Sequence, residues 1–193
     1  EIGAYVKARN TDFNIQAKDT PSDGVITGYG VINGGLVYVY SQDASVLGGS
    51  VGEMHAKKIA SLYDMAMKTG SPVIGLIDST GLRLQESVDG LKAFGQIYMK
   101  QSLASGVIPT VTAIFGNCGG GLSIVAGLSD FTFMEVENAQ LFVNSPNAIT
   151  ENRKEICDNA SAKFQSEEAG NVDFVGTEAE VIEGIRNLVS DSF

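Results

Sequence analysis

One stretch constrains the fold of this chain more than any other: residues 109–125, which read PTVTAIFGNCGGGLSIV. Alternating and β-branched residues over 111–115 predict a buried strand that ends at Gly116. The glycines at 119–121 then open a small, apolar segment at 122–128 that is compatible with a helix. Glycine permits a tight backbone, and the first amides of a helix have no internal acceptor. The pattern therefore indicates either a turn that aims N–H groups at a negatively charged ligand atom or a turn that only packs a helix closely on a strand.

A second turn of the same kind lies upstream, in residues 72–83, which read PVIGLIDSTGLR. Two strand-to-glycine turns in one chain favour a site for an oxyanion or a phosphate. The net charge is −10, but residues 54–118 contain six Lys or Arg and four Asp or Glu, a local excess of 6 − 4 = +2. This least acidic part holds both turns, as an anionic ligand would require. Solvated helix faces would give the same numbers, so the charge is secondary support.

The rest of the pattern predicts an α/β fold in which two strands precede a helix at least twice. Two β-rich runs flank Asn33-Gly34-Gly35 and predict a hairpin. Ser50 and Glu53 have the spacing of a capping box and predict the start of a helix that ends at Thr69. The other predicted elements are a strand at 72–78, a helix at 86–104, two hairpin-like strands at 131–136 and 139–144, a partly helical segment within 147–170, and a last helix capped by Thr177 and Glu180.

The side chains near the turns offer little conventional catalysis. His55 is the only histidine, and its place within a predicted helix indicates a satisfied or surface residue rather than the base of a triad. Cys118 lies on the second turn without a GxSxG pattern, which favours packing or a ligand wall. Asp78 and Glu86 are the nearest carboxylates, and Arg83 suits either a ligand or a loop network. A site made of backbone donors suits the stabilisation of a thioester enolate whose base comes with the substrate or cofactor.

Composition excludes several classes of protein. The net charge of −10 argues against nucleic acid as a main partner. Two cysteines, Cys118 and Cys157, cannot form a disulfide framework, and no spacing of His, Cys, Asp or Glu indicates a metal site. No segment is typical of a signal peptide or a membrane span. We therefore expect a cytoplasmic protein, without a metal, that forms one substantial domain or a tightly joined pair.

Several longer motifs occur in a specific order. They are SDGVITGYGVINGGLVYVYSQDASVLGGS, HAKK, PVIGLIDSTGLRLQE, LASGVIP, and GNCGGG followed by GLSDFTFM. With these motifs the chain resembles the N-terminal domain of biotin-dependent carboxyltransferases over nearly its whole length. That family includes the β subunits of propionyl-CoA and acyl-CoA carboxylases and the carboxyltransferase subunits of sodium-pumping decarboxylases.

The resemblance implies a crotonase/ClpP-like spiral of ββα units that moves a carboxyl group between carboxybiotin and the α-carbon of an acyl-CoA. It implies that backbone amides polarise the thioester carbonyl, and the matching positions are Gly81, Leu82, Gly120 and Gly121. It also implies that the coenzyme A side is lined by a loop and the start of the second turn, at Ser45, Val46, Gly48, Gly49 and Gly119.

The same resemblance implies the partners. Biotin comes on a carrier protein or domain and is held mainly by a second, homologous domain across a dimer interface. We therefore expect residues 1–193 to be the acyl-CoA-binding half of an oligomeric enzyme, with the biotin-binding domain outside this chain and no activity without it. A membrane partner is expected only in the decarboxylase case.

Two departures from the family pattern concern the turns. Residues 79–83 read STGLR where the family usually has SGGAR, so Leu82 is expected to narrow or reshape the acyl pocket. Asn117 stands where the family usually has proline. Two alternatives stay open from the residues. One is a crotonase-type enoyl-CoA hydratase or isomerase, with Glu86 or Asp78 as its base, and the other is a non-catalytic acyl-CoA-binding module.

Overall fold

A β-hairpin forms one edge of the sheet. In the computed structural model, which describes residues 1–9, 19–146 and 158–192, β1 (Val25–Ile32) pairs antiparallel with β2 (Gly35–Gln42). Asn33 and Gly34 connect the two strands with φ angles of 47° and 89°. Two positive values in a two-residue loop are typical of a type I′ turn, which matches the twist of the strands. The predicted hairpin is therefore confirmed.

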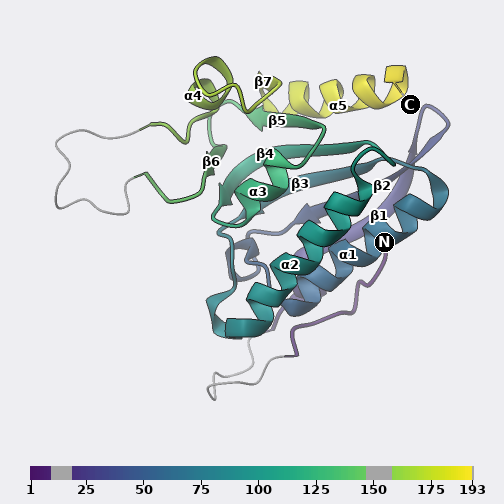
Figure 1. The fold of residues 1–193 in the computed structure, drawn as a ribbon, viewed down its shortest axis with the longest axis vertical. Helices are drawn as coiled ribbons and strands as arrows, with labels where there is room; N and C mark the ends of the chain where they lie inside the picture. The colour runs from purple at the N-terminus through teal and green to yellow at the C-terminus, as the bar shows by residue number, and fades with distance from the viewer. Residues whose placement is uncertain (10–18, 147–157, 193) are drawn as a thin grey trace.

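Five further strands extend the sheet: β3 (Val73–Ser79), β4 (Thr110–Gly119), β5 (Phe131–Glu135), β6 (Gln140–Phe142) and β7 (Phe174–Gly176). All of them pair in parallel, and the main order is β1-β2-β3-β4-β5-β7, with β6 added on β4. Parallel strands need long crossovers, and helices supply them here (Figure 1).

The described part of the chain forms five α-helices: α1 (Glu53–Thr69), α2 (Ser87–Ala104), α3 (Leu122–Gly127), α4 (Ala162–Glu167) and α5 (Glu178–Ser192). Short 3₁₀ turns lie at η2 (Pro21–Gly24), η3 (Leu47–Gly49) and η4 (Leu84–Glu86). Two strands precede a helix twice, in β1-β2-α1 and β5-β6-α4, as the sequence pattern predicts. Among the described helices, none has the length and apolar character to cross a membrane.

Hydrophobic layers cover both faces of the sheet. α1, α2 and α3 pack on one face through a cluster that includes Leu62 and Leu122. α5 covers the other face through a cluster that includes Val181. Figure 1 shows this arrangement, with α5 above the strands and α1 and α2 below them. β3 contributes Ile77 to the first layer and Ile74 to the second, as expected of a strand that is buried on both faces.

β4 does not end at Gly116, where the sequence predicts a break. It continues to Gly119, and its pairing with β3 shifts register on the way. The Asp78 side chain fills the space beside Gly116, since a Cβ added there would lie 2.1 Å from Asp78 Oδ1. The Asn117 N–H donates to the same oxygen over 3.2 Å, a bond that a proline could not make. The glycine therefore produces a bulge within a continuing strand.

β5 and β6 do not form the hairpin that their sequence resembles. β5 pairs with residues 111–114 of β4 and β6 with residues 117–119, both in parallel. The two strands therefore follow one another along the same edge of β4. This prediction is wrong because β4 continues past its bulge and offers a second pairing site.

Ser50 and Glu53 do not form the predicted capping box. α1 begins at Glu53 after Gly52, and the Glu53 N–H donates to Glu86 Oε2 over 2.5 Å. The Ser50 hydroxyl instead accepts a hydrogen bond from Arg83 Nε over 3.3 Å. A carboxylate distant in the sequence therefore caps the helix, and the local serine has another partner.

Other helix ends agree with the sequence. α1 ends at Thr69 before Gly70, which has a φ of 68°. At the start of α5 the Thr177 N–H donates to Glu180 Oε2 over 2.8 Å, and the Glu180 N–H donates to the Thr177 hydroxyl over 3.4 Å. α4 supplies a helical part of the 147–170 segment, of which residues 147–157, Cys157 included, lie outside the described residues.

Candidate active site

Three segments distant in the sequence meet where β3 and β4 end. They are the first glycine turn (residues 79–83), the second glycine turn (residues 116–121) and the loop at residues 45–49. A Cβ added to Gly81 would lie 3.0 Å from the Gly119 carbonyl oxygen, so the two turns are in contact. The Thr80 N–H donates to the Gly48 carbonyl over 3.0 Å, which joins the loop to the first turn.

The first turn leaves the Leu82 amide without a partner among the described residues. Gly81 has a φ of 100°, which side-chain-bearing residues rarely adopt. The Val51 N–H donates to the Gly81 carbonyl over 2.8 Å, and the Arg83 N–H donates to the Val51 carbonyl over 2.9 Å. The Gly81 N–H donates to the Ser79 hydroxyl over 3.1 Å. Between these bonds the Leu82 N–H has no acceptor in the described part of the chain.

The second turn also has one amide without a partner in the part of the chain that the structure describes. The Gly120 N–H donates to the Phe142 carbonyl over 3.0 Å and extends the pairing of β4 with β6. The Gly121 carbonyl accepts from the Tyr98 hydroxyl of α2 over 2.7 Å, which fixes this residue. Within residues 1–9, 19–146 and 158–192, the Gly121 N–H has no acceptor.

The four amides predicted as donors therefore divide into two pairs. Leu82 and Gly121 have N–H groups without an acceptor among the described residues, whereas Gly81 and Gly120 donate within the protein. α3, which follows the second turn, has only six residues. Its dipole is correspondingly small, so the chemistry of the site depends on individual amides.

The Leu82 side chain lies against α2. A Cβ added to Gly90 of α2 would lie 2.8 Å from Leu82 Cδ1, so the leucine packs on that helix. Leu82 is half-buried against the main hydrophobic cluster. This contact gives the Leu82 side chain a packing role on α2, and the expectation that it narrows or reshapes the acyl pocket stays a prediction.

The loop at residues 45–49 contains both exposed residues and buried residues that pack on the first turn. Ser45 is exposed, and its N–H and hydroxyl both donate to Asp43 Oδ1, over 2.9 and 2.6 Å. Gly48 is half-buried beside the first turn. Val46 and Gly49 are buried, and a Cβ on Gly49 would lie 2.2 Å from a backbone oxygen of β3. The loop thus fits too tightly on the first turn to accept a larger residue there.

A buried ion network lies next to the first turn. Arg83 Nη1 is 2.6 Å from Asp23 Oδ1 and 3.0 Å from Glu86 Oε1. Arg83 Nη2 donates to the Ser50 carbonyl over 2.8 Å. The three charged side chains are at most 4% exposed. Of the two roles that the sequence allows for Arg83, the structure shows the loop network.

His55 belongs to the same network and is neutral. Its ring Nδ1 is 2.9 Å from the Asp23 carbonyl, and its Nε2 is 3.2 Å from Gln42 Nε2. Since a carbonyl only accepts, the ring proton is on Nδ1, and Nε2 accepts from the glutamine amide. Burial, with the nearby charges of Arg83 and Lys58, lowers the pKa of His55 to about 3. The prediction of a satisfied histidine is confirmed.

Cys118 packs in the core. It is fully buried in the cluster between the sheet and α1–α3. Burial raises the pKa of its thiol to about 12. Because the thiolate is the nucleophilic form, this residue is inert at neutral pH.

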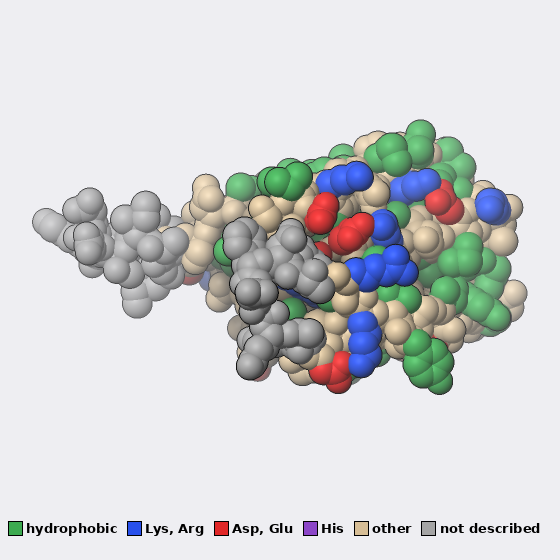
Figure 2. All heavy atoms as spheres, turned by 90° about the horizontal axis from the view of Figure 1, so that it is seen from below, with side chains coloured by type: hydrophobic (Ala, Val, Ile, Leu, Met, Phe, Trp, Pro, Cys, Tyr) green, Lys and Arg blue, Asp and Glu red, His purple; other side chains and the backbone are tan. Residues whose placement is uncertain are grey.

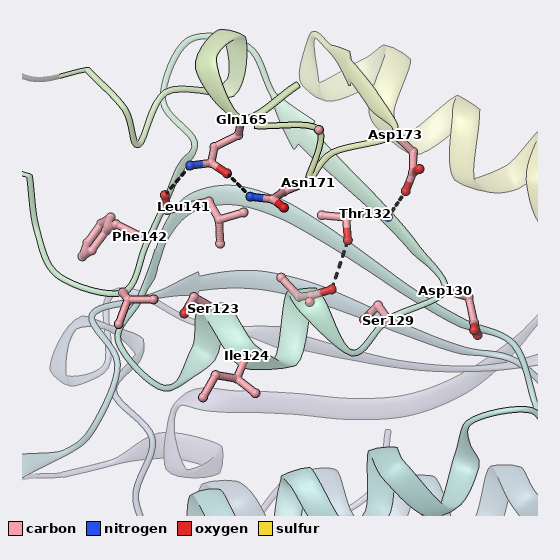
Figure 3. Close-up of a pocket in the computed structure, with 14 residues that line it drawn as sticks. Ser123, Ile124, Ser129, Asp130, Thr132, Leu141, Phe142, Gln165, Asn171 and Asp173 are labelled. Carbon is pink, nitrogen blue, oxygen red and sulfur yellow. Dashed lines mark hydrogen bonds between the residues drawn. The ribbon is translucent and has the colours of Figure 1, made fainter. Parts of the chain in front are cut away.

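A cavity that the sequence does not predict adjoins the second turn (Figure 3). Its volume is about 530 Å³, and it lies among α3, β6, α4 and the segment before β7. Ser123 lines it and donates through its hydroxyl to the Gly120 carbonyl over 2.7 Å. The described lining includes Asp130 and Asp173 but no Lys or Arg, so it disfavours phosphate. The lining comes from separate segments without a shared motif, so no sequence pattern indicates this cavity.

Phe142 forms a wall between this cavity and the second turn. It lines the cavity, and a Cβ added to Gly119 would lie 2.7 Å from its ring. Gly119 is therefore a glycine of close packing rather than an exposed ligand contact.

The charged surface is mixed. Figure 2 views the end of the molecule that faces downward in Figure 1, and basic side chains gather there with acidic ones among them. Part of the positive charge of α1 and α2 is paired, with Lys57 Nζ 2.5 Å from Glu53 and Lys100 Nζ 2.6 Å from Asp64. Of the six basic residues between 54 and 118, two are thus paired at the surface, and Lys58 and Arg83 are buried.

Solved structures share this architecture. Over 98% of its length the chain aligns with transcarboxylase 12S, in the structure with methylmalonyl-coenzyme A and methylmalonic acid bound. The TM-score is 0.91 with 34% identity, and 38% of that chain is covered. A Pseudomonas malonate decarboxylase hetero-tetramer aligns over 90% of this chain and 68% of its own, with a TM-score of 0.78 and 26% identity. The predicted crotonase-like α/β fold is confirmed.

Sequence relatives identify the family. The methylmalonyl-CoA decarboxylase subunit alpha of Propionigenium modestum is 48% identical over 149 residues, or 77% of this chain. The propionyl-CoA carboxylase beta chain of Roseobacter denitrificans is 47% identical over 149 residues, again 77%. The carboxyl transferase domain model matches residues 1–191. The chain belongs to the carboxyl transferase domain family, and it spans 29% of the length of each of these two relatives.

Because His55 is neutral in the folded protein, we expect the folded state to lose stability in acid. Between pH 6.5 and about 3 the unfolded chain binds a proton at His55 that the folded chain does not bind. The free energy of unfolding should therefore fall with pH in this window, by up to about 1.4 kcal/mol per pH unit from this residue. His55→Asn keeps a donor for the Asp23 carbonyl but does not titrate. Denaturant unfolding at pH 7.5, 6 and 5 should show a smaller slope for the variant, and equal slopes would contradict a neutral buried imidazole.

A buried, protonated Cys118 predicts that Cys118→Ala in the full-length protein lowers turnover by at most about a few-fold, since a thiol nucleophile would instead lose several orders of magnitude. Iodoacetamide should also leave the Cys118 peptide of the native protein unmodified, as measured by peptide mass mapping. Complete inactivation with unchanged circular dichroism would refute the packing role.

Proposed function

We propose that this chain is the acyl-CoA-binding part of a biotin-dependent carboxyltransferase, which moves a carboxyl group between carboxybiotin and the α-carbon of an acyl-CoA. The observation that carries the proposal is a pair of unpaired amides, Leu82 and Gly121, on turns that touch at Gly81 and Gly119. Family membership and relatives named for propionyl-CoA and methylmalonyl-CoA support the substrate class.

The role of the two amides is to stabilise negative charge on the thioester oxygen. When the α-carbon gains or loses a carboxyl group, its electron pair is shared with the thioester carbonyl as an enolate. Rigid donors aimed at that oxygen lower the barrier, and losing one such donor typically costs about 10²–10³ in kcat. We assign this role to the Leu82 and Gly121 amides. Gly81 and Gly120 shape the turns, since their N–H groups donate internally.

We place coenzyme A along the loop at residues 45–49, which is hydrogen-bonded to the first turn. Ser45 and Gly48 are its accessible residues, and Val46, Gly49 and Gly119 support them from the interior. The cavity beside α3 is a poor place for the phosphates, because it contains two aspartates and no described basic residue.

Biotin, when bound, supplies the carboxyl group. We assign its site to a second, homologous domain that faces this one and receives biotin from a carrier protein or domain. In this proposal the thioester binds both unpaired amides of the two turns, so neither is left for biotin. This supports a separate site for biotin. Relatives described as a hexamer and a hetero-tetramer support an oligomer. A cytoplasmic setting belongs to the same proposal, with a membrane partner only for a decarboxylase.

The residues disfavour the hydratase alternative. Glu86 is buried, and its two oxygens accept from Arg83 and from the Glu53 N–H, so it is not placed to act as a base. Asp78 accepts from the Asn117 N–H at the bulge of β4. The relatives are named as carboxylases and decarboxylases, which favours carboxyl transfer over hydration and over a non-catalytic module.

Replacing single amides by esters tests the assignment of the donors. An ester linkage in place of the Leu82 or the Gly121 N–H, introduced with the corresponding α-hydroxy acid, should lower kcat by about 10²–10³. The matched control is the same replacement at Gly120, which removes the bond to the Phe142 carbonyl. We expect the control to lower thermal stability by about 1 kcal/mol with little change in kcat. The reverse pattern would assign the donor to Gly120.

The division of the site predicts the behaviour of residues 1–193 alone. We expect calorimetry to detect weak binding of propionyl-CoA, because the two turns are open to water without a facing domain. Decarboxylation of methylmalonyl-CoA with free biotin should be undetectable and should return when the second domain is added. Full transfer activity from residues 1–193 alone would refute the divided site, and hydration of an enoyl-CoA would favour the hydratase alternative.

A further inference from the structure

Arg83 directly follows Leu82 in the chain. Both its backbone and its side chain make hydrogen bonds within the protein. Its N–H donates to the Val51 carbonyl over 2.9 Å, and the Val51 N–H donates to the Gly81 carbonyl over 2.8 Å. These bonds hold the peptides on either side of Leu82. The Arg83 side chain is 1% exposed, so it has no access to a ligand in solution.

The guanidinium joins three segments that are separate in sequence. It is 2.6 Å from Asp23 Oδ1 in the turn before β1 and 3.0 Å from Glu86 Oε1 in η4. It also donates to the Ser50 carbonyl over 2.8 Å and to the Ser50 hydroxyl over 3.3 Å, just before α1. The first glycine turn is therefore fixed relative to the start of α1, the end of the 45–49 loop and the approach to α2.

Stability alone is a weak reason for such a network. Removing charges from water is costly, and apolar replacements of buried ion groups are often neutral or stabilising. A planar guanidinium with several donors does offer what an apolar side chain cannot, a fixed orientation between segments. Because the residue next to it carries a proposed oxyanion donor, orientation has a direct chemical use here.

We propose that Arg83 is a positioning residue: through Asp23, Ser50 and Glu86 it holds the Leu82 N–H toward the thioester oxygen. This inference rests on the proposed function, because it needs the Leu82 amide to be a donor. It predicts that a change in the guanidinium weakens the hydrogen bond to the thioester carbonyl before it weakens the binding of coenzyme A.

The test compares two buried cations in the full-length protein. Arg83→Lys keeps the charge but cannot reach all partners of the fork. Lys58→Met is the matched control: Lys58 donates to the Ser22 hydroxyl over 2.5 Å and to the Ser22 and Val25 carbonyls, on the same turn as Asp23, but it has no described bond to residues 79–83. The probe is propionyl-CoA with ¹³C at the thioester carbonyl, and the readouts are its infrared frequency when bound, kcat and KM.

For Arg83→Lys we expect kcat to fall by about 10- to 100-fold, because a small misplacement of a positioned group has this effect. KM should stay within about threefold, since the binding surface is retained. The bound carbonyl should lose at least about half of the shift to lower frequency that the wild type shows, as expected for a weakened hydrogen bond. Lys58→Met should lower the melting temperature and leave all three readouts near those of the wild type.

An unchanged carbonyl frequency in folded Arg83→Lys, beside a clear shift in the wild type, would overturn the positioning role. Equal loss of the shift in Lys58→Met would do the same, because it would indicate general loosening. If the wild type itself shows no shift, the proposed function fails first, and the inference fails with it. Should Arg83→Lys not fold, Glu86→Gln removes one ion pair and keeps an oxygen for the Glu53 N–H. Retention of both kcat and the carbonyl shift in that variant would then refute the proposal.

Discussion

Gly81 and Gly119 approach each other so closely that a side chain at Gly81 would press on the opposite backbone. This contact exists because β3 and β4 are parallel neighbours, so their carboxyl ends reach the same edge of the sheet. The bulge at Gly116 lets β4 continue beyond the point where β3 turns away. The positions of both unpaired amides depend on this backbone contact, since each amide lies one or two residues from it.

A buried ion network also holds the first turn in place. Arg83 brings two carboxylates, Asp23 and Glu86, into an interior that excludes water. Glu86 in turn accepts the first amide of α1, and Asp23 accepts the backbone N–H of His55 over 2.8 Å. One network therefore defines the start of a helix, the tautomer of a histidine and the orientation of the first turn.

The sequence predicted the parts of this structure that depend on neighbours in the chain. The hairpin at Asn33 and Gly34, the end of α1 at Gly70 and the two glycine turns all follow from local backbone preferences. The sequence did not predict contacts between residues that are far apart in the chain. The cap on Glu53 comes from Glu86, the partner of β6 is β4, and the Gly120 amide is paired with the Phe142 carbonyl.

α2 is connected to both turns. It starts directly after η4, close to Arg83, and eleven residues further along its Tyr98 hydroxyl donates to the Gly121 carbonyl. At the rise of an α-helix these points are roughly 16 Å apart along one rigid rod. α2 therefore contacts the first turn near its start, through Gly90 and Leu82, and the second turn through Tyr98. A single helix thus contacts both turns, and its outer face includes the exposed Val88 and Leu91.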